Sequence, residues 1–341
     1  MNIKFWGVRG SIPSPVSAYD TKWRAREIVA AALDARLDKT DAAAVGDFLD
    51  QLPYHLLQPI GGNTSCVEVT SGGDRLILDM GSGLRALGGD LCQRADFTEK
   101  ELYMAIETGQ NLSAYESEGG AELLNLNILT SHIHWDHIQG FPFFAPAYQP
   151  GNKITIFGAD AEKLAWALNA QQTAPILFPI DLAGMGASIE FKSFPIGEEL
   201  RFGSLTVKAM AMPHPGGSLA YRLEAEGRSA VYATDYEFPD PNGDEVEKFV
   251  KFINGADILI SDTQYTYLEG VAREGWGHST SFGAIDLAMK AGIKNFFLFH
   301  HDPEHSDAKL MDNLGKTRAY YLMMSQNGKM TIDLAREGLT I

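Results

Sequence analysis

Short runs in which apolar and polar residues alternate recur along most of the chain, a pattern typical of half-buried β-strands. The first run opens near the N-terminus and the last lies about forty residues before the end of the chain. The predicted strands are Ile3–Gly7, Cys66–Thr70, Arg75–Asp79, Leu124–Thr130, 153–158, 188–194, 205–212, 219–225, 229–235, Asp257–Asp262 and Asn295–His300.

Helical spacing of apolar residues separates many of these strands and predicts six helices. They are Thr21–Leu37, Ala43–Leu52, Ala161–Ala170, Asp244–Asn254, Ser281–Ala291 and Ser306–Ser325. The simplest α/β arrangement for such a pattern is two sheets with helices on their outer faces. We expect one domain over 1–341 with two insertions, a helical one at about 15–60 and a polar one at about 90–122.

Charge and hydropathy narrow the classes of partner. The chain has 28 Lys and Arg against 44 Asp and Glu, a net charge of −16, and such a surface repels nucleic acid and anionic membranes. No apolar run approaches the roughly 18 residues of a membrane span, and the N-terminus lacks the apolar core of a signal peptide. We therefore expect a cytoplasmic protein with no membrane association.

The segment SHIHWDH, residues 131–137, carries the strongest chemical signal, because three of the nine histidines fall within it. If the preceding strand runs on, His132 and His134 point to the same side, since alternate residues of a strand share a face. Asp136 and His137 can then reach a second point nearby as the chain turns. Imidazole and carboxylate suit zinc, iron or manganese, and two metals about 3.5–4 Å apart can hold a bridging hydroxide.

Three more candidates lie at the carboxyl ends of predicted strands, where loops gather functional groups. His214 follows a strand, and Asp235 and His300 each end one. They complete two ligand sets. One metal would be bound by His132, His134 and His214. The other would be bound by Asp136, His137 and His300, with Asp235 bridging the two.

The order of motifs LILDMGSG, TSHIHWDH, MPHPGG, YATD and LFHHDP resembles that of the metallo-β-lactamase-fold hydrolases. The resemblance runs from Met1 to about His305 apart from the two insertions. It implies a four-layer αβ/βα sandwich with two divalent metals, zinc first and manganese or iron as alternatives, at one edge between the sheets. It also implies that Asp79, in LILDMGSG, orients a metal ligand.

The C-terminal half, with DILISDTQY and GHST, is similar to the branch that contains tRNase Z and small cyclic phosphodiesterases. By that similarity His278 donates a proton to the leaving oxygen and is oriented by Asp262. The usual serine-rich segment after the last ligand histidine is replaced here by HDPEHSD. The choice between His300 and His301 as the metal ligand therefore stays open, although alignment favours His300. His301 could then lie over the pocket or face the side of Asp302.

Arg9, after the first predicted strand, has two interpretations of equal weight. It could face substrate as an anion clamp, or it could form a structural ion pair with a nearby loop.

The favoured activity is hydrolysis of a phosphodiester by a metal-bridged hydroxide, with Asp136 and His278 in the catalytic site. A lactone, carboxylic ester or thioester is the alternative substrate, and a di-iron protein that binds or senses oxygen or nitric oxide is a further one. tRNase Z grips tRNA with a basic arm, whereas neither insertion here is basic. For this reason, and because the net charge is negative, we do not expect tRNA or another nucleic acid as substrate. We expect a small phosphodiester or ester instead, and a homodimer.

Overall fold

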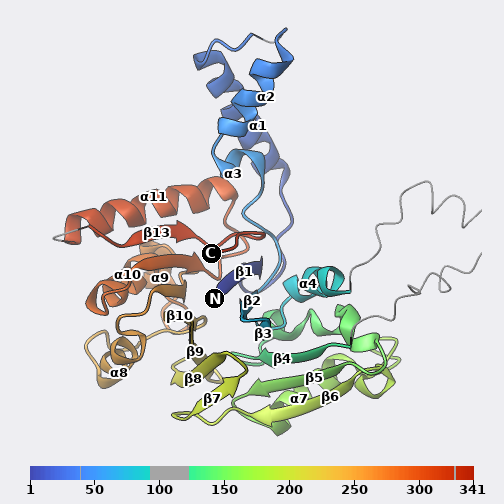
Figure 1. Ribbon diagram of the computed structural model, residues 1–341. Coiled ribbons are helices and arrows are strands. Elements are labelled where there is room, and N and C mark those ends of the chain that lie inside the picture. The colour runs from blue at the N-terminus through green and yellow to red at the C-terminus, as the bar shows by residue number, and fades with distance from the viewer. Residues whose placement is uncertain (39, 93–122, 326–327) are drawn as a thin grey trace, which may run out of the picture.

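A computed structural model describes residues 1–38, 40–92, 123–325 and 328–341, which fold around two β-sheets (Figure 1). The first sheet has six strands in sequential order: β1 (Asn2–Gly7), β2 (Cys66–Ser71), β3 (Asp74–Leu78), β4 (Asn125–Leu129), β5 (Lys153–Gly158) and β6 (Ser188–Ser193). The second has seven, also in sequential order: β7 (Glu199–Phe202), β8 (Leu205–Met212), β9 (Ser218–Ala225), β10 (Arg228–Ala233), β11 (Ile258–Asp262), β12 (Asn295–Phe299) and β13 (Thr331–Leu334).

Both sheets divide into an antiparallel part and a parallel part. In the first sheet β1, β2 and β3 pair antiparallel, whereas β3 to β6 pair parallel. In the second, β7 to β10 pair antiparallel and β10 to β13 parallel. The carboxyl ends of parallel strands meet at one edge of a sheet, which is where open α/β sheets bind ligands.

The strand β3 shows how the sequence builds the layers, because both of its faces are buried. Leu76 and Leu78 belong to the apolar cluster between the two sheets, together with Phe5 of β1 and Val231 of β10. Ile77 points to the opposite face and packs in the cluster beneath the helices of the first sheet. This alternation follows from the two-residue period of a strand.

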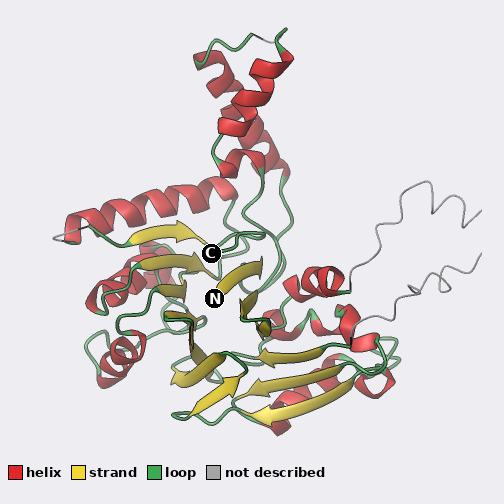
Figure 2. Cartoon of the chain, viewed as in Figure 1, coloured by secondary structure: helices red, strands yellow, loops and turns green. Residues whose placement is uncertain are grey.

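Helices cover the outer faces of both sheets (Figure 2). The α-helices in the described residues are α1 (Ala18–Asp34), α2 (Ala42–Gln51), α3 (Tyr54–Leu57), α4 (Gly83–Leu91), α6 (Trp135–Ile138), α7 (Ala161–Gln171), α8 (Asp244–Ile253), α9 (Tyr267–Ala272), α10 (Ser281–Lys290) and α11 (Asp307–Met324). Helices α4 and α7 contact the first sheet, and α10 and α11 contact the second. The predicted four-layer sandwich is thereby confirmed. None of the helices described here combines the length and apolar character needed to cross a bilayer.

Most predicted elements are present with ends shifted by a few residues. The short strands β7 and β13 and the helices α3, α4, α6 and α9 were not predicted. Helix α4 contains the pair Gly88–Gly89, which lowers helix propensity, and packs instead through the buried Leu84 and Leu87. Helices α1 and α2 project away from the sheets between β1 and β2 (Figure 1), where a helical insertion was predicted. Most of the second predicted insertion, 93–122, lies outside the described residues, and the division into one domain with two insertions stays a prediction.

Arg9 is buried and joins three distant segments. Its Nε donates to the carbonyl of Gly61 at 2.8 Å. Nη1 donates to the carbonyls of Asp302 and His305 at 3.0 and 2.7 Å, and Nη2 pairs with Asp307 at 3.4 Å. The guanidinium is thus used within the fold, so the structural interpretation holds and the predicted anion clamp is wrong.

The Asp307 carboxylate extends this network, because it also pairs with Arg24 of α1 and accepts from the backbone of Ile60. Helix α1, the segment before β2 and the start of α11 are therefore held together by one buried carboxylate and two guanidinium groups. Removing one member of such a network leaves an uncompensated buried charge.

We expect Arg9→Ala to lower the free energy of unfolding by about 3 kcal/mol, because Asp307 and three carbonyls lose a buried partner. Urea unfolding followed by circular dichroism measures the change. Lys192→Ala is the control: Lys192 is exposed and pairs with Glu190 on β6, so its loss should cost less than about 0.5 kcal/mol. Equal effects of the two substitutions would contradict the structural role of Arg9.

Candidate metal centre

The SHIHWDH segment lies immediately after β4 at the carboxyl edge of the first sheet. The strand ends at Leu129, so it does not run on to His132 and His134, which lie on a loop. The one-turn helix α6 then carries Asp136 and His137, both of them buried. The turn into α6 sends the second pair of side chains to a different point from the first.

The second sheet contributes the other candidates from the ends of three strands. His214 follows β8, Asp235 follows β10, and His300 comes directly after β12. Asp235 and His300 have φ values of 54° and 59°, and Asp79, directly after β3, has φ of 61°. This left-handed conformation is uncommon for residues other than glycine and clusters at functional sites. It turns each side chain back from its strand toward the space between the sheets.

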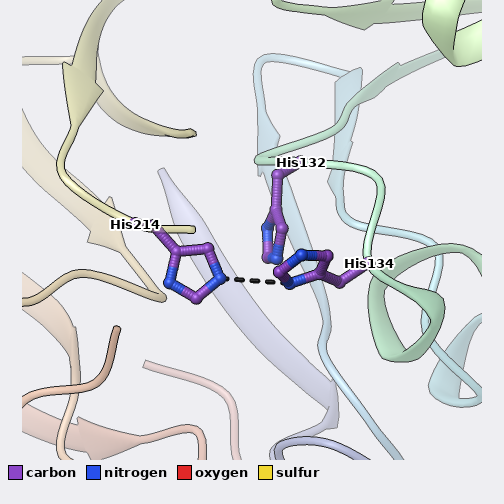
Figure 3. Close-up of side chains that lie close together, drawn as sticks. All are labelled: His132, His134 and His214. Atoms are coloured by element: carbon purple, nitrogen blue, oxygen red, sulfur yellow. Dashed lines mark hydrogen bonds between the residues drawn. The ribbon is translucent and has the colours of Figure 1, made fainter. Parts of the chain in front are cut away.

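His132, His134 and His214 form the first group (Figure 3). His134 Nδ1 lies 3.1 Å from His214 Nε2, and the His132 ring is 4.5 Å from that of His134 and 4.8 Å from that of His214. His132 Nε2 is buried and has no hydrogen-bond partner among the described residues. A buried nitrogen without a partner is costly, and a shared cation would satisfy it.

Asp136, His137, Asp235 and His300 form the second group, and all four are buried. Nε2 of His137 and Nε2 of His300 are 3.2 Å apart, and each lies 3.2 Å from Oδ2 of Asp136 and 3.2 Å from Oδ2 of Asp235. Ligands about 2.0–2.1 Å from a tetrahedral zinc ion are separated by about 3.3 Å. The spacing of these atoms therefore fits a small divalent cation.

The Asp235 carboxylate faces both groups. Its Oδ2 belongs to the second group, whereas Oδ1 lies 3.8 Å from His132 Nε2 and 3.9 Å from His214 Nε2 in the first. One carboxylate thus presents one oxygen to each set of donors, which is the arrangement predicted for a bridging ligand.

Hydrogen bonds fix which ring nitrogen of each histidine is free. Nδ1 of His137 donates to Asp79 Oδ2 at 2.8 Å, and Nδ1 of His300 donates to Gln264 Oε1 at 3.0 Å. Nδ1 of His214 donates to the Gly277 carbonyl at 2.8 Å. Each bond leaves Nε2 with a lone pair aimed into the cluster, as second-layer partners of metal-binding histidines do.

The Asp79 carboxylate accepts several of the hydrogen bonds that surround the metal-donor groups. Besides His137, it accepts from the Ser131 backbone at 2.6 Å, from Ser131 Oγ at 2.8 Å and from the Tyr232 hydroxyl at 2.7 Å. Ser131 Oγ, having given its proton to Asp79, accepts from His132 Nδ1 at 3.1 Å. One aspartate therefore orients His137 directly and His132 through a serine. Motif order indicated Asp79, but nothing in the sequence indicated Ser131, Tyr232 or Gln264.

The surroundings set the charge of the donors. Burial lowers the pKa of His132 well below its usual range and lowers the pKa of His134 and of His214 as well. Burial would raise the pKa of Asp136 and Asp235, but neighbouring imidazoles hold both values well below the ordinary one. Burial would lower the pKa of His137, but the carboxylates of Asp136, Asp235 and Asp79 raise it well above its ordinary value. Metals bind neutral imidazoles and ionised carboxylates, so metal binding at His137 would release a proton.

His278 lies at the edge of the cluster with Asp262 behind it. Its Nδ1 is 2.8 Å from Asp262 Oδ2, and its ring stacks on His300 with centroids 5.1 Å apart. Burial opposes the charged form, but the Asp262 carboxylate outweighs it and raises the pKa of His278 to about 9. Asp262 also accepts from the Asp235 backbone at 3.1 Å. A pocket of about 400 Å³, lined in part by Tyr236 and Phe238, opens beside His278.

The two adjacent histidines after β12 point to different places. His300 is in the cluster, whereas His301 is 1% exposed and its Nε2 donates to the Ala335 carbonyl at 2.9 Å. Burial, followed by the charge on Arg9, lowers the pKa of His301 to about 3, so it is neutral. The suggestion that His301 lies over the pocket as a substrate contact is therefore wrong.

Two residues before α1 complete the wall, although the sequence did not single them out. The Ser11 backbone donates to Asp136 Oδ2 at 2.7 Å. A Cβ at Gly10 would lie 2.5 Å from the His300 ring, so only glycine allows the chain to pass this close. The loop after β1 thus packs directly on the second group.

Comparisons with known proteins agree with this geometry. A family model described as "Beta-lactamase superfamily domain" matches residues 118–301, more than half of the chain, and confirms the resemblance seen in the motifs. That range contains every member of the two groups.

Three individual proteins illustrate the likeness. Ribonuclease Z from Picrophilus torridus is 38% identical over 92 residues, 27% of each chain, so that alignment spans about a quarter of that relative. Ribonuclease Z from Exiguobacterium sibiricum is 26% identical over 217 residues, covering 53% of this chain and 72% of the relative. The metallo-beta-lactamase fold protein YhfI from Bacillus subtilis shares the fold with TM-score 0.56 and 17% identity, covering 100% and 98% of the two chains.

We expect Asp79→Asn to weaken divalent-metal affinity about 10- to 100-fold, because an amide cannot hold the His137 and Ser131 protons as a carboxylate does. Competition with a chromophoric chelator measures the dissociation constant. Asp312→Asn is the matched control, since Asp312 is exposed and pairs only with Lys316 among its described neighbours. An affinity for Asp79→Asn within twofold of the unmodified protein would contradict the orienting role.

Proposed function

The chain belongs to the beta-lactamase superfamily, and we propose that it is a metal-dependent hydrolase that cleaves phosphodiester bonds. The observation that carries the proposal is the pair His278–Asp262 at the edge of two groups of metal donors that share Asp235. Such a pair supplies a proton donor, which the departing oxygen of a phosphodiester needs more than an activated carbonyl substrate does.

The donor sets support two divalent cations, zinc first and manganese or iron as alternatives. His132, His134 and His214 would hold one, and Asp136, His137 and His300 the other, with Asp235 shared. When bound, such cations polarise a phosphoryl oxygen and lower the pKa of water. The unpartnered His132 Nε2 and the 3.2 Å spacing of the second group are the features that fit them.

The protein's own groups position and protonate the substrate. Asp262 holds the proton on Nδ1 of His278, and the raised pKa keeps the ring protonated at neutral pH. The Nε2 proton is then available to the leaving oxygen, which becomes a free hydroxyl group. The pocket beside His278 gives the leaving group a place to lie. After transfer, Asp262 and Asp235 favour the return of a proton to the ring.

RNA is the substrate class to which the relatives point. Our expectation that tRNA and other nucleic acids are not substrates is wrong, because curated relatives that align with 53% and 51% of this chain are named Ribonuclease Z. The expectation rested on the net charge of −16. Net charge describes the whole surface, whereas cations in a cleft supply local positive charge to a phosphate.

We expect His278→Ala to lower kcat for RNA at least about 100-fold, because the leaving oxygen loses its proton donor. Turnover of bis-p-nitrophenyl phosphate, whose nitrophenolate leaves without protonation, should fall much less. Both rates are measured with zinc, manganese and iron, and metal content is checked by mass spectrometry.

His55→Ala, on α3 away from the cluster, is the control for this experiment. Turnover of a lactone or a thioester without phosphodiester turnover would contradict the proposal and favour carbonyl substrates. A bound iron pair that reacts with oxygen without any hydrolysis would contradict it in favour of the di-iron alternative.

His214→Ala should separate the two proposed metal positions. We expect the metal content to fall from two ions per chain to about one, because the second group keeps all its donors while the first loses a ligand. Plasma mass spectrometry of the purified protein gives the count. Retention of both ions would show that His214 is not a ligand.

A further inference from the structure

Two tryptophans adjoin the candidate site and are turned to solvent. Trp135 is 73% exposed and stands between His134 and Asp136 in the sequence. Trp276 is 63% exposed and precedes His278 by two residues. Large apolar side chains displayed beside a functional site mark a binding surface more often than isolated ones elsewhere do.

The loop that carries Trp276 is rigidly built. The backbones of Gly275 and Gly277, on either side of the indole, both donate to the Glu237 carboxylate at 2.9 and 2.7 Å. Their φ values of 83° and 89° favour glycine, and a Cβ at Gly277 would lie 2.4 Å from His214. The loop is therefore clamped onto a proposed ligand and presents one large ring outward, which lowers the entropy cost of binding.

Trp135 lies in the segment that follows β4 of the first sheet, and its neighbour in the chain is held in place. It is the first residue of α6, and its neighbour Asp136 is buried and accepts from the Ser11 backbone. Trp135 is the chain neighbour of His134, which belongs to the first donor group, and of Asp136, which belongs to the second. Consecutive Cα atoms lie about 3.8 Å apart, so the Trp135 side chain starts close to both groups. The ring of His134, its other neighbour, is 4.9 Å from that of His214.

Arg273 adds a cation to the same rim. Its guanidinium lies 4.9 Å from the centre of the Tyr265 ring and 5.9 Å from that of Trp276. Tyr265 in turn meets the His278 ring edge-on at 5.7 Å. Within the part of the chain that the structure describes, no carboxylate forms an ion pair with Arg273. An unneutralised arginine is notable beside a reaction site in a protein of net charge −16.

We propose that Trp135, Trp276 and Arg273 bind the single-stranded nucleotides that flank the cleaved bond; this rests on the proposed phosphodiesterase function. Bases stack on the two indoles, and a backbone phosphate pairs with Arg273. Single strands offer free base faces for such stacking, whereas the bases of a duplex are already stacked on one another. The substrate at the metal centre is thus an unpaired segment of RNA.

Binding of a fluorescein-labelled, 12-nucleotide single-stranded RNA tests the proposal directly. Fluorescence anisotropy is measured in the metal-loaded His278→Ala protein, so that the strand is not cut. We expect Trp135→Ala and Trp276→Ala each to raise Kd about tenfold, as the loss of one stacked base does. Arg273→Gln should weaken binding and reduce the slope of log Kd against log salt by about one. A duplex of the same length should bind more weakly than the single strand.

Trp166→Ala is the matched control, because Trp166 is 70% exposed but lies on α7, on the outer face of the first sheet. Its Kd should equal that of the parent, and equal effects of all three tryptophan substitutions would overturn the proposal. Unchanged binding in Trp135→Ala and Trp276→Ala, with RNA still cleaved by the unmodified protein, would overturn the proposed binding surface and leave the proposed function standing. If no phosphodiester is cleaved but binding depends on the two tryptophans, the surface is supported and the proposed function falls.

Discussion

The arrangement of the whole site depends on the Asp235 carboxylate, which presents one oxygen to each group of donors. Its position is set by a left-handed backbone after β10 and by the bond from its own amide to Asp262. Asp262 also bonds His278. The carboxylate proposed to be shared between the two cations and the histidine proposed as proton donor are therefore positioned by the same side chain. A shift of either aspartate would therefore disturb binding and protonation together.

A second constraint is the way the strands end. Asp79, Asp235 and His300 all adopt the left-handed conformation at the carboxyl edge of a sheet, at a cost of order 1 kcal/mol each. The surrounding core fixes these strands, since the cluster between the sheets contains residues from nearly every strand. The packing of the core therefore holds this strain, and the strained backbone directs the three polar side chains toward the cluster of histidines and aspartates.

The sequence was informative where function is carried by residue type and order. His132, His134, Asp136 and His137 stand in one motif, and the strands before His214, Asp235 and His300 could be recognised as short apolar segments of the chain. It failed where the answer depends on direction in space. For Arg9 the sequence left a substrate contact and a structural ion pair equally open, and His301 was suggested to lie over the pocket. Both side chains are buried among backbone carbonyls, which no linear pattern reveals. The supporting roles of Ser131 and Gln264 were missed for the same reason, because their partners lie far away in the chain or are set by a turn.

The donors come from both sheets, and His300 lies after the last strand but one. A nascent chain that has left the ribosome only as far as β11 already contains the SHIHWDH segment, yet it lacks His300 and cannot complete the second group. Chemical competence therefore arises late, when β12 has joined the second sheet and the two sheets have docked.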